Sequence, residues 1–229
     1  CETAYDLIVK NDVDILWFSF SFNELDEDGE LSDIRVYNPY CNEILYSREQ
    51  IQSFYFIDND KGGGVCLWNK IYKTELIKLS HSKMETFYCL VPNDVYADFY
   101  ISYYANKMLG ISTEPLYTHY FGRGVEGNSK ISLEKFEKIC RDSQGISLTR
   151  KFLEREKTLE EQEKYLSGWT KHFQNYCFNV CCRRVKTEDL DKAVKILYRY
   201  FNDKDNAAEI TLNLLTELRN YINWVDELR

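Results

Sequence analysis

The segment that decides the fold reads Leu67-Trp68-Asn69-Lys70-Ile71-Tyr72-Lys73-Thr74-Glu75-Leu76. Two more segments complete the series: Pro92-Asn93-Asp94-Val95-Tyr96-Ala97-Asp98-Phe99, then Pro115-Leu116-Tyr117-Thr118-His119-Tyr120-Phe121-Gly122-Arg123-Gly124. Residues 93–108 are apolar on most faces, which predicts a buried helix lying against a sheet. Residues 116–121 are typical of a strand, in which alternation puts Tyr117 and His119 on one face. Together these segments predict an α/β domain.

The sequence before this series extends the α/β pattern. Residues 2–10 have apolar side chains at helical spacing and lead into the apolar run 15–22, which predicts a helix followed by a strand. A turn at Asp28-Gly29 and a second strand near residues 34–37 are expected next. Ser47-Arg48-Glu49-Gln50 has the capping-box pattern and predicts a helix through residues 51–55. A helix and strand at the very start indicate a domain entered midway.

The sequence beyond residue 130 is helical in pattern and has no proline. Leu159, Leu166, Phe173 and Val180 are seven residues apart and predict one long helix. Two more helices are predicted over residues 190–201 and 210–222, and the three could pack as a small bundle. The predicted organisation is an α/β domain over residues 1–129 and a helical C-terminal region over residues 130–229.

Charge and hydropathy exclude several classes of protein. Residues 1–129 hold 10 Lys and Arg against 20 Asp and Glu, whereas residues 130–229 hold 19 against 17. An acidic first half repels phosphate backbones, which argues against a nucleic-acid-binding protein. No apolar run reaches the length of a membrane span, so we expect a cytoplasmic protein.

The eight cysteines show no Cys-x-x-Cys spacing and lie in apolar patterns, which indicates reduced core residues. His172 with Cys177, Cys181 and Cys182 has a helix-compatible spacing for a soft metal, although a buried helix face explains the cysteines more simply. The basic end of that helix, Arg183, Arg184 and Lys186, suits a helix C-terminus. It is also a candidate contact for a phosphate-linked lipid.

The three opening segments, in this order, resemble the acceptor half of bacterial family 2 glycosyltransferases. Those proteins have a "Trp-Asn-Lys-Leu-Tyr" segment, an acidic pair at the start of a helix and a "Leu-Tyr-x-Tyr" strand. The resemblance covers about the first 125 residues. It implies part of a GT-A-type mixed sheet and an enzyme that moves a sugar from a nucleotide-diphosphate donor to a glycan or lipid-linked acceptor, usually in surface polysaccharide synthesis.

Asp94 is the first candidate for a catalytic residue. The resemblance implies that an acid in this segment deprotonates the acceptor hydroxyl, which is a poor nucleophile until a carboxylate takes its proton. The family more often has Glu-Asp where this chain has Asn93-Asp94. The other interpretation, compatible with the first, is that Asn93 or Asp94 caps the helix. A base at Asp94 favours inversion at the anomeric carbon.

The resemblance implies substrate contacts from Trp68, Asn69, Lys70, Asn93, Tyr117 and Arg123. Lys70 is a candidate for binding a donor phosphate or an acceptor hydroxyl, because an ammonium is a compact point charge. The alternatives are that Trp68 belongs to the core and that Lys70 pairs with a surface carboxylate. His119 is a candidate metal ligand or a histidine satisfied by core partners. Arg123, between two glycines, is a candidate phosphate contact or an ordinary surface turn.

The donor-binding half of the resembled family carries an Asp-x-Asp motif that holds Mg²⁺ or Mn²⁺ on the donor diphosphate. Asp26-Glu27-Asp28 and Asp58-Asn59-Asp60 match the motif literally but lie in the wrong context, the first in a predicted turn and the second too close to Trp68. We expect the true motif just upstream of Cys1. The chain as given would therefore bind donor poorly alone.

Two alternatives to an enzyme remain open at this point. One is a non-catalytic module that only binds glycan. The other is a helical assembly module, which forms a homodimer or docks on a partner synthase through the stripe from Leu159 to Val180. Peripheral contact with the inner face of the membrane is compatible with all three hypotheses.

Overall fold

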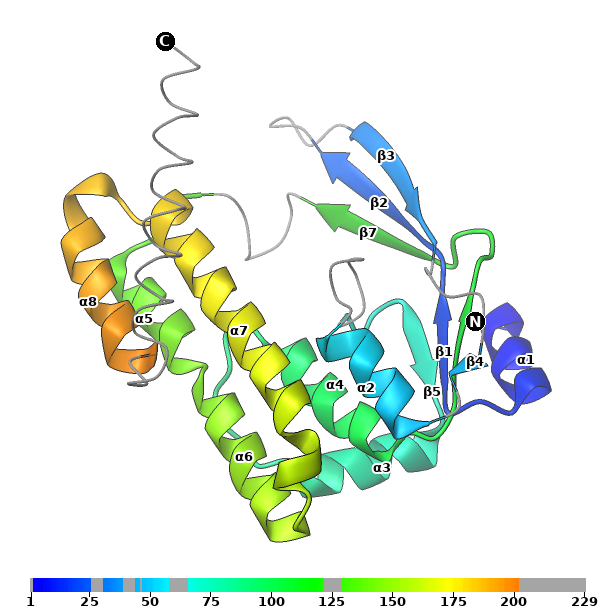
Figure 1. Cartoon of the computed structure of the whole chain (residues 1–229). Helices are drawn as coiled ribbons and strands as arrows, with labels where there is room; N and C mark the ends of the chain where they lie inside the picture. The colour runs from blue at the N-terminus through cyan, green and yellow to red at the C-terminus, as the bar shows by residue number, and fades with distance from the viewer. Residues whose placement is uncertain are drawn as a thin grey trace. The chain divides into compact units, whose positions relative to one another are not determined.

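The computed structural model describes residues 2–25, 31–38, 44–45, 47–57, 66–121 and 129–201. This part of the chain is a mixed α/β protein with a helical C-terminal region (Figure 1), which confirms the predicted fold class. The chain divides into two compact units. The first takes the described residues within Cys1–Thr86, Asn93–Gly127 and Glu161–Tyr165, and the second takes those within Phe87–Pro92, Asn128–Glu160 and Leu166–Arg229.

A four-stranded mixed sheet with the order β4-β6-β1-β5 forms the centre of the first unit. Its strands are β1 (Ile15–Phe18), β4 (Ile44–Leu45), β5 (Lys70–Tyr72) and β6 (Met108–Ile111). β1 runs parallel to β6 and antiparallel to β5. All four residues of β1 are buried, as expected for a strand whose two faces are both covered.

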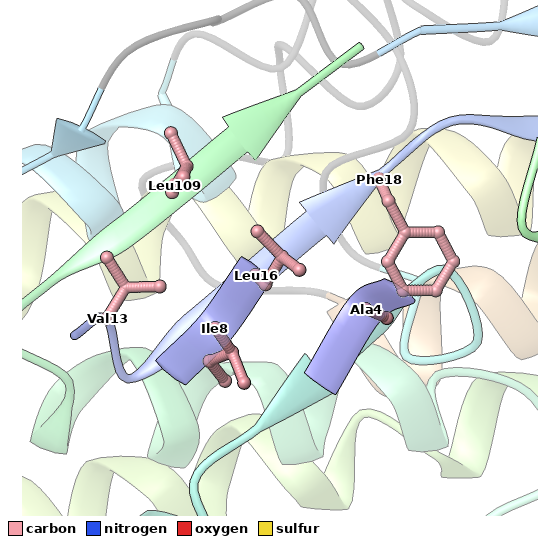
Figure 2. Packing of buried hydrophobic residues seen from close by; sticks show 6 residues of the cluster. All are labelled: Ala4, Ile8, Val13, Leu16, Phe18 and Leu109. Carbon is pink, nitrogen blue, oxygen red and sulfur yellow. The ribbon is translucent and has the colours of Figure 1, made fainter. Parts of the chain in front are cut away.

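Helices cover both faces of this sheet. They are α1 (Glu2–Asn11), α2 (Arg48–Phe56), α3 (Thr74–Lys83) and α4 (Asn93–Tyr104). Leu16 and Phe18 point toward α1, where they pack with Ala4, Ile8, Val13 and Leu109 (Figure 2). Trp17 points to the other face, and its ring lies 5.2 Å from that of Phe54 on α2. The predicted cap of α2 is confirmed, because the Ser47 hydroxyl accepts the Gln50 N–H.

A second, three-stranded sheet has the order β3-β2-β7. It consists of β2 (Phe20–Leu25), β3 (Leu31–Tyr37) and β7 (Tyr117–Phe121), with β2 antiparallel to β3 and parallel to β7. The prediction of one strand over residues 15–22 was therefore wrong. The chain changes sheet at the buried Ser19, whose hydroxyl donates to Asn38 Oδ1 (2.7 Å) and accepts the Thr113 N–H (2.9 Å).

The prediction of one helix over residues 93–108 was also wrong at its end. α4 stops at Tyr104, and residues Met108–Ile111 form β6 instead. A carboxylate oxygen of Asp14 accepts the N–H groups of Asn106 (2.8 Å) and Lys107 (3.1 Å). These hydrogen bonds turn the chain after α4, and β6 then pairs with β1, so a tertiary contact overrides the local apolar pattern.

The second unit is helical and takes in α5 (Leu133–Arg141), α6 (Gln144–Glu156), most of α7 (Leu159–Arg184) and α8 (Leu190–Phe201), with a short 3₁₀ turn at Thr187–Asp189. The predicted helices over residues 159–180 and 190–201 are confirmed. The predicted helix over residues 210–222 and the turn at Asp28-Gly29 lie outside the described residues. No helix among the described residues combines the length and the apolar character that a membrane crossing needs.

Candidate active site

Three of the predicted site residues come together in the first unit, on one face of the β3-β2-β7 sheet. The register puts Phe20 opposite both Tyr37 and Tyr117, and Phe22 opposite His119. Since side chains alternate along a strand, these rings share a face. Trp68 lies on the same face, and we call the six rings the aromatic cluster: Phe20, Phe22, Tyr37, Trp68, Tyr117 and His119.

Trp68 is the centre of the aromatic cluster. Its ring stacks on His119 with 4.9 Å between centroids and on Tyr117 with 5.1 Å. Phe20 meets Trp68 at 4.6 Å in an edge-to-face arrangement. Such pairs stabilise beyond their buried area, by about 0.5–1.5 kcal/mol each. The predicted shared face of Tyr117 and His119 is confirmed. Trp68, from a turn distant in the sequence, stacks on both.

Part of the aromatic cluster is open to solvent. Tyr37 is 37% exposed and Tyr117 is 36% exposed, while Trp68, Phe22 and His119 are half-buried. An accessible set of aromatic rings can pack against the flat, apolar C–H face of a sugar ring, and the tyrosine hydroxyl can donate or accept hydrogen bonds. The prediction that Trp68 belongs to the core was half right, because its ring is only partly buried.

The Asp94 carboxylate lies next to the segment that carries Trp68. Its Oδ2 accepts the backbone N–H of Leu67 at 3.5 Å, a long hydrogen bond. Asp94 is half-buried and stands in the first turn of α4, where its own N–H donates to Asn93 Oδ1 (3.0 Å). The exposed Asn93 therefore makes the local contact at this helix end, and Asp94 makes a tertiary one.

Lys70 lies below the surface, at the start of β5. Its Nζ is 3.8 Å from an Asp98 carboxylate oxygen, and neither side chain has any exposed surface. The same ammonium donates to the carbonyl of Cys66 and lies 5.3 Å from the centre of the Tyr55 ring. The prediction of a surface partner for Lys70 was wrong, because the partner is a buried carboxylate on α4. This placement does not favour a direct phosphate contact.

Burial sets the protonation of the groups around Lys70. It raises the pKa of Asp98 to about 6, an increase that Lys70 opposes and Asp94 reinforces. Burial also raises the pKa of Tyr72 well above its usual value, with a further contribution from Asp98, which its hydroxyl approaches at 3.5 Å. The pKa of the Cys66 thiol rises to about 11, mainly through burial. The thiol and the phenol are therefore neutral at pH 7.

Asn69 is wholly buried between Trp68 and Lys70. Its amide nitrogen and oxygen have no hydrogen-bond partner among the described residues, and the same holds for the buried Gln52 of α2. Its backbone carbonyl accepts the Phe18 N–H at 3.2 Å, which joins this turn to the end of β1. Asn69 thus holds the turn in place through its backbone rather than offering its side chain at the surface.

The remaining metal and phosphate candidates do not gather in the part of the chain that the structure describes. Arg123 and both Asp-x-Asp strings lie outside it. Among the described residues, no three His, Cys, Asp or Glu side chains approach closely enough to hold a metal ion. Neither His119 nor the set of His172 with the cysteines of α7 therefore forms such a group. Cys140, Cys177 and Cys181 are wholly buried and reduced, and burial raises the pKa of Cys181 to about 12.

The sequence reasoning missed Asp98, Tyr72, Phe20 and Tyr37. Asp98 had a readable signal, since it is a charged residue in the middle of an apolar helix and four residues after Asp94. A charge at such a position is expected to be paired. Phe20 and Tyr37 carried no such signal, because their role depends on strand register. Comparison of this chain with protein families, curated proteins and solved structures gives no match.

Proposed function

We propose that this chain is the acceptor side of a family 2-type glycosyltransferase that builds surface polysaccharide. One observation carries the proposal: Leu67 and Trp68 are consecutive residues, and Leu67 contacts Asp94 while Trp68 stacks on Tyr117 and His119. A surface suited to sugar rings and a carboxylate suited to proton removal therefore adjoin.

The proposed reaction uses both features. The acceptor sugar packs on the aromatic cluster and directs a hydroxyl toward Asp94. The carboxylate takes the hydroxyl proton while the oxygen forms a bond to the anomeric carbon of the donor. The bond from that carbon to the diphosphate oxygen breaks, and the nucleoside diphosphate leaves with the electron pair. Attack opposite the leaving group inverts the configuration.

We propose that a donor-binding half, as in the resembled family, supplies the donor site and the ligands of Mg²⁺ or Mn²⁺. The cation would neutralise charge on the leaving diphosphate. The described residues form no group that fits a metal ion, and the proposed roles of this chain are those of its own side chains. The proposed setting is the cytoplasm, with the acceptor a glycan or a lipid-linked sugar at the inner membrane face.

The test is nucleotide-sugar turnover with Mn²⁺ across a panel of donors, by this chain joined to its natural upstream sequence. We expect turnover that requires the upstream segment and falls at least 100-fold in Asp94→Asn, the range in which a positioned general base acts. Glu75→Gln, which neutralises an exposed acid on α3, should leave it unchanged. Equal rates for Asp94→Asn and wild type would remove Asp94 as the base.

A glycan-binding module without catalysis is the second candidate, because the aromatic cluster alone can bind sugar rings. That module would bind glycan equally well in Asp94→Asn and would turn over no donor. Leu166, Phe173 and Val180 of α7 are buried within this chain, which does not favour assembly through that stripe.

A further inference from the structure

We infer that Lys70 is a positioning residue, whose buried ammonium holds the turn at residues 66–69 against α4 and so keeps Trp68 beside Asp94. Lys70 is buried beside Asp98, at a position where the sequence suggested a substrate contact. The relevance of the positioning role to sugar transfer rests on the proposed function. Its structural content, the order of the turn, does not depend on any substrate.

Three contacts hold the ammonium. It donates to the carbonyl of Cys66, which precedes it by four residues, so the hydrogen bond closes the turn upon itself. It lies 3.8 Å from the Asp98 carboxylate, which joins the closed turn to α4. The Tyr55 ring of α2 lies 5.3 Å away on another side, a distance suited to a cation–π contact. A neutral side chain of the same length would supply none of the polar contacts.

α4 holds the turn at a second place. Asp94 accepts the Leu67 N–H, and Asp94 and Asp98 are four residues apart, so both carboxylates face the turn from one side of the helix. Without the ammonium, the Cys66 carbonyl would lose the donor that closes the turn, and the buried Asp98 would lose the charge that joins the turn to α4. The turn would then be less firmly held against α4, and Trp68 would be less firmly held in the aromatic cluster.

The experiment compares Lys70→Met with the matched surface variant Lys78→Met, which removes an exposed lysine from α3. Two readouts follow the turn without any substrate: amide exchange of the peptide over residues 66–70, and alkylation of Cys66 mapped by mass spectrometry. We expect both rates to rise at least tenfold in Lys70→Met and to stay at the wild-type rate in Lys78→Met. Exchange in α5 and α8 serves as the internal reference.

A double variant separates positioning from plain stability. Lys70→Met combined with Asp98→Leu removes both buried charges, which commonly restores stability lost by removing one. We expect its urea midpoint to recover most of the loss in Lys70→Met, while exchange and Cys66 alkylation stay at least tenfold above wild type. A double variant with wild-type protection of the turn would overturn the inference, even if the single variant fails to fold.

Failure of this inference and failure of the proposed function are distinguishable. If Lys70→Met loosened the turn but the wild-type protein turned over no donor, the positioning role would stand and the proposed transferase function would be rejected. Donor turnover that depends on Asp94, with a turn unaffected in both Lys70 variants, would leave the transferase and overturn the positioning role.

Discussion

Asp94 and Asp98 lie one helical turn apart on α4, yet their carboxylates occupy different environments. Asp94 is half-buried and contacts the Leu67 N–H, whereas Asp98 is wholly buried beside Lys70. Two acids in unlike surroundings can serve unlike tasks. In our proposal Asp94 takes the acceptor proton, and Asp98 holds the ammonium that orders the neighbouring turn.

The pH dependence of stability should depend on Asp98. Burial raises its pKa from 3.8 to about 6. Between these values the folded protein binds the proton that the unfolded chain has released, so the free energy of unfolding falls as pH rises from about 4 to 6. The full difference corresponds to about 3 kcal/mol. Asp98→Asn should lack this fall, which urea denaturation from pH 4 to 8 would measure. If the free energy of unfolding fell equally with pH in Asp98→Asn and in the wild type, Asp98 would not be the cause of the fall.

Trp68 should govern both sugar binding and local stability. Trp68→Ala removes the stacks on Tyr117 and His119 and should lower the free energy of unfolding by about 2 kcal/mol. We expect it to abolish binding to an array of bacterial oligosaccharides, while Trp68→Phe keeps most of it. The control is Tyr88→Ala, which removes a ring that is 80% exposed. If Trp68→Ala still bound sugar, the aromatic cluster would not be the acceptor site.

Asp142 should hold the segment over residues 87–92 within the second unit. Its buried carboxylate accepts the N–H groups of Leu90 (2.8 Å) and Val91 (2.9 Å). Asp142→Ala leaves both N–H groups without this acceptor and should lower the free energy of unfolding by about 3 kcal/mol. Amide exchange over this segment should also become faster. Asp142→Asn keeps one acceptor oxygen and should cost less. If Asp142→Ala left the free energy of unfolding unchanged, water would be replacing the carboxylate as the acceptor.

Lys157 offers a stabilising substitution. It ends α6 with φ 59° and ψ 35°, the left-handed region that costs a residue with a Cβ about 1 kcal/mol. Lys157→Gly should therefore raise the free energy of unfolding by about 1 kcal/mol, measured by chemical denaturation. The matched variant Lys151→Gly, at an exposed position inside α6, should lower it by about the same amount. Opposite signs at these two positions are the expected result.

Local patterns sufficed for several elements. The Ser47 cap, the long helix α7 and the shared face of Tyr117 and His119 all followed from residues within a few positions of one another. Helical spacing, strand alternation and side-chain capping act over one or two turns of chain, which is why the sequence carried them. The choice of Asp94, Trp68 and Lys70 as candidate site residues came from the resemblance, and the structure shows that α4 contacts the turn that carries Trp68 through Asp94 and Asp98.

Tertiary contacts decided the rest. Ser19 splits an apolar run into two strands because Asn38 and Thr113 bind its hydroxyl, and α4 ends early because Asp14 captures the N–H groups of Asn106 and Lys107. Lys70 is buried because Asp98, on another element, compensates its charge. Each outcome depends on a partner between 19 and 94 residues away. Such pairings form only when folding brings distant segments of the chain together, so no local pattern in the sequence could specify them.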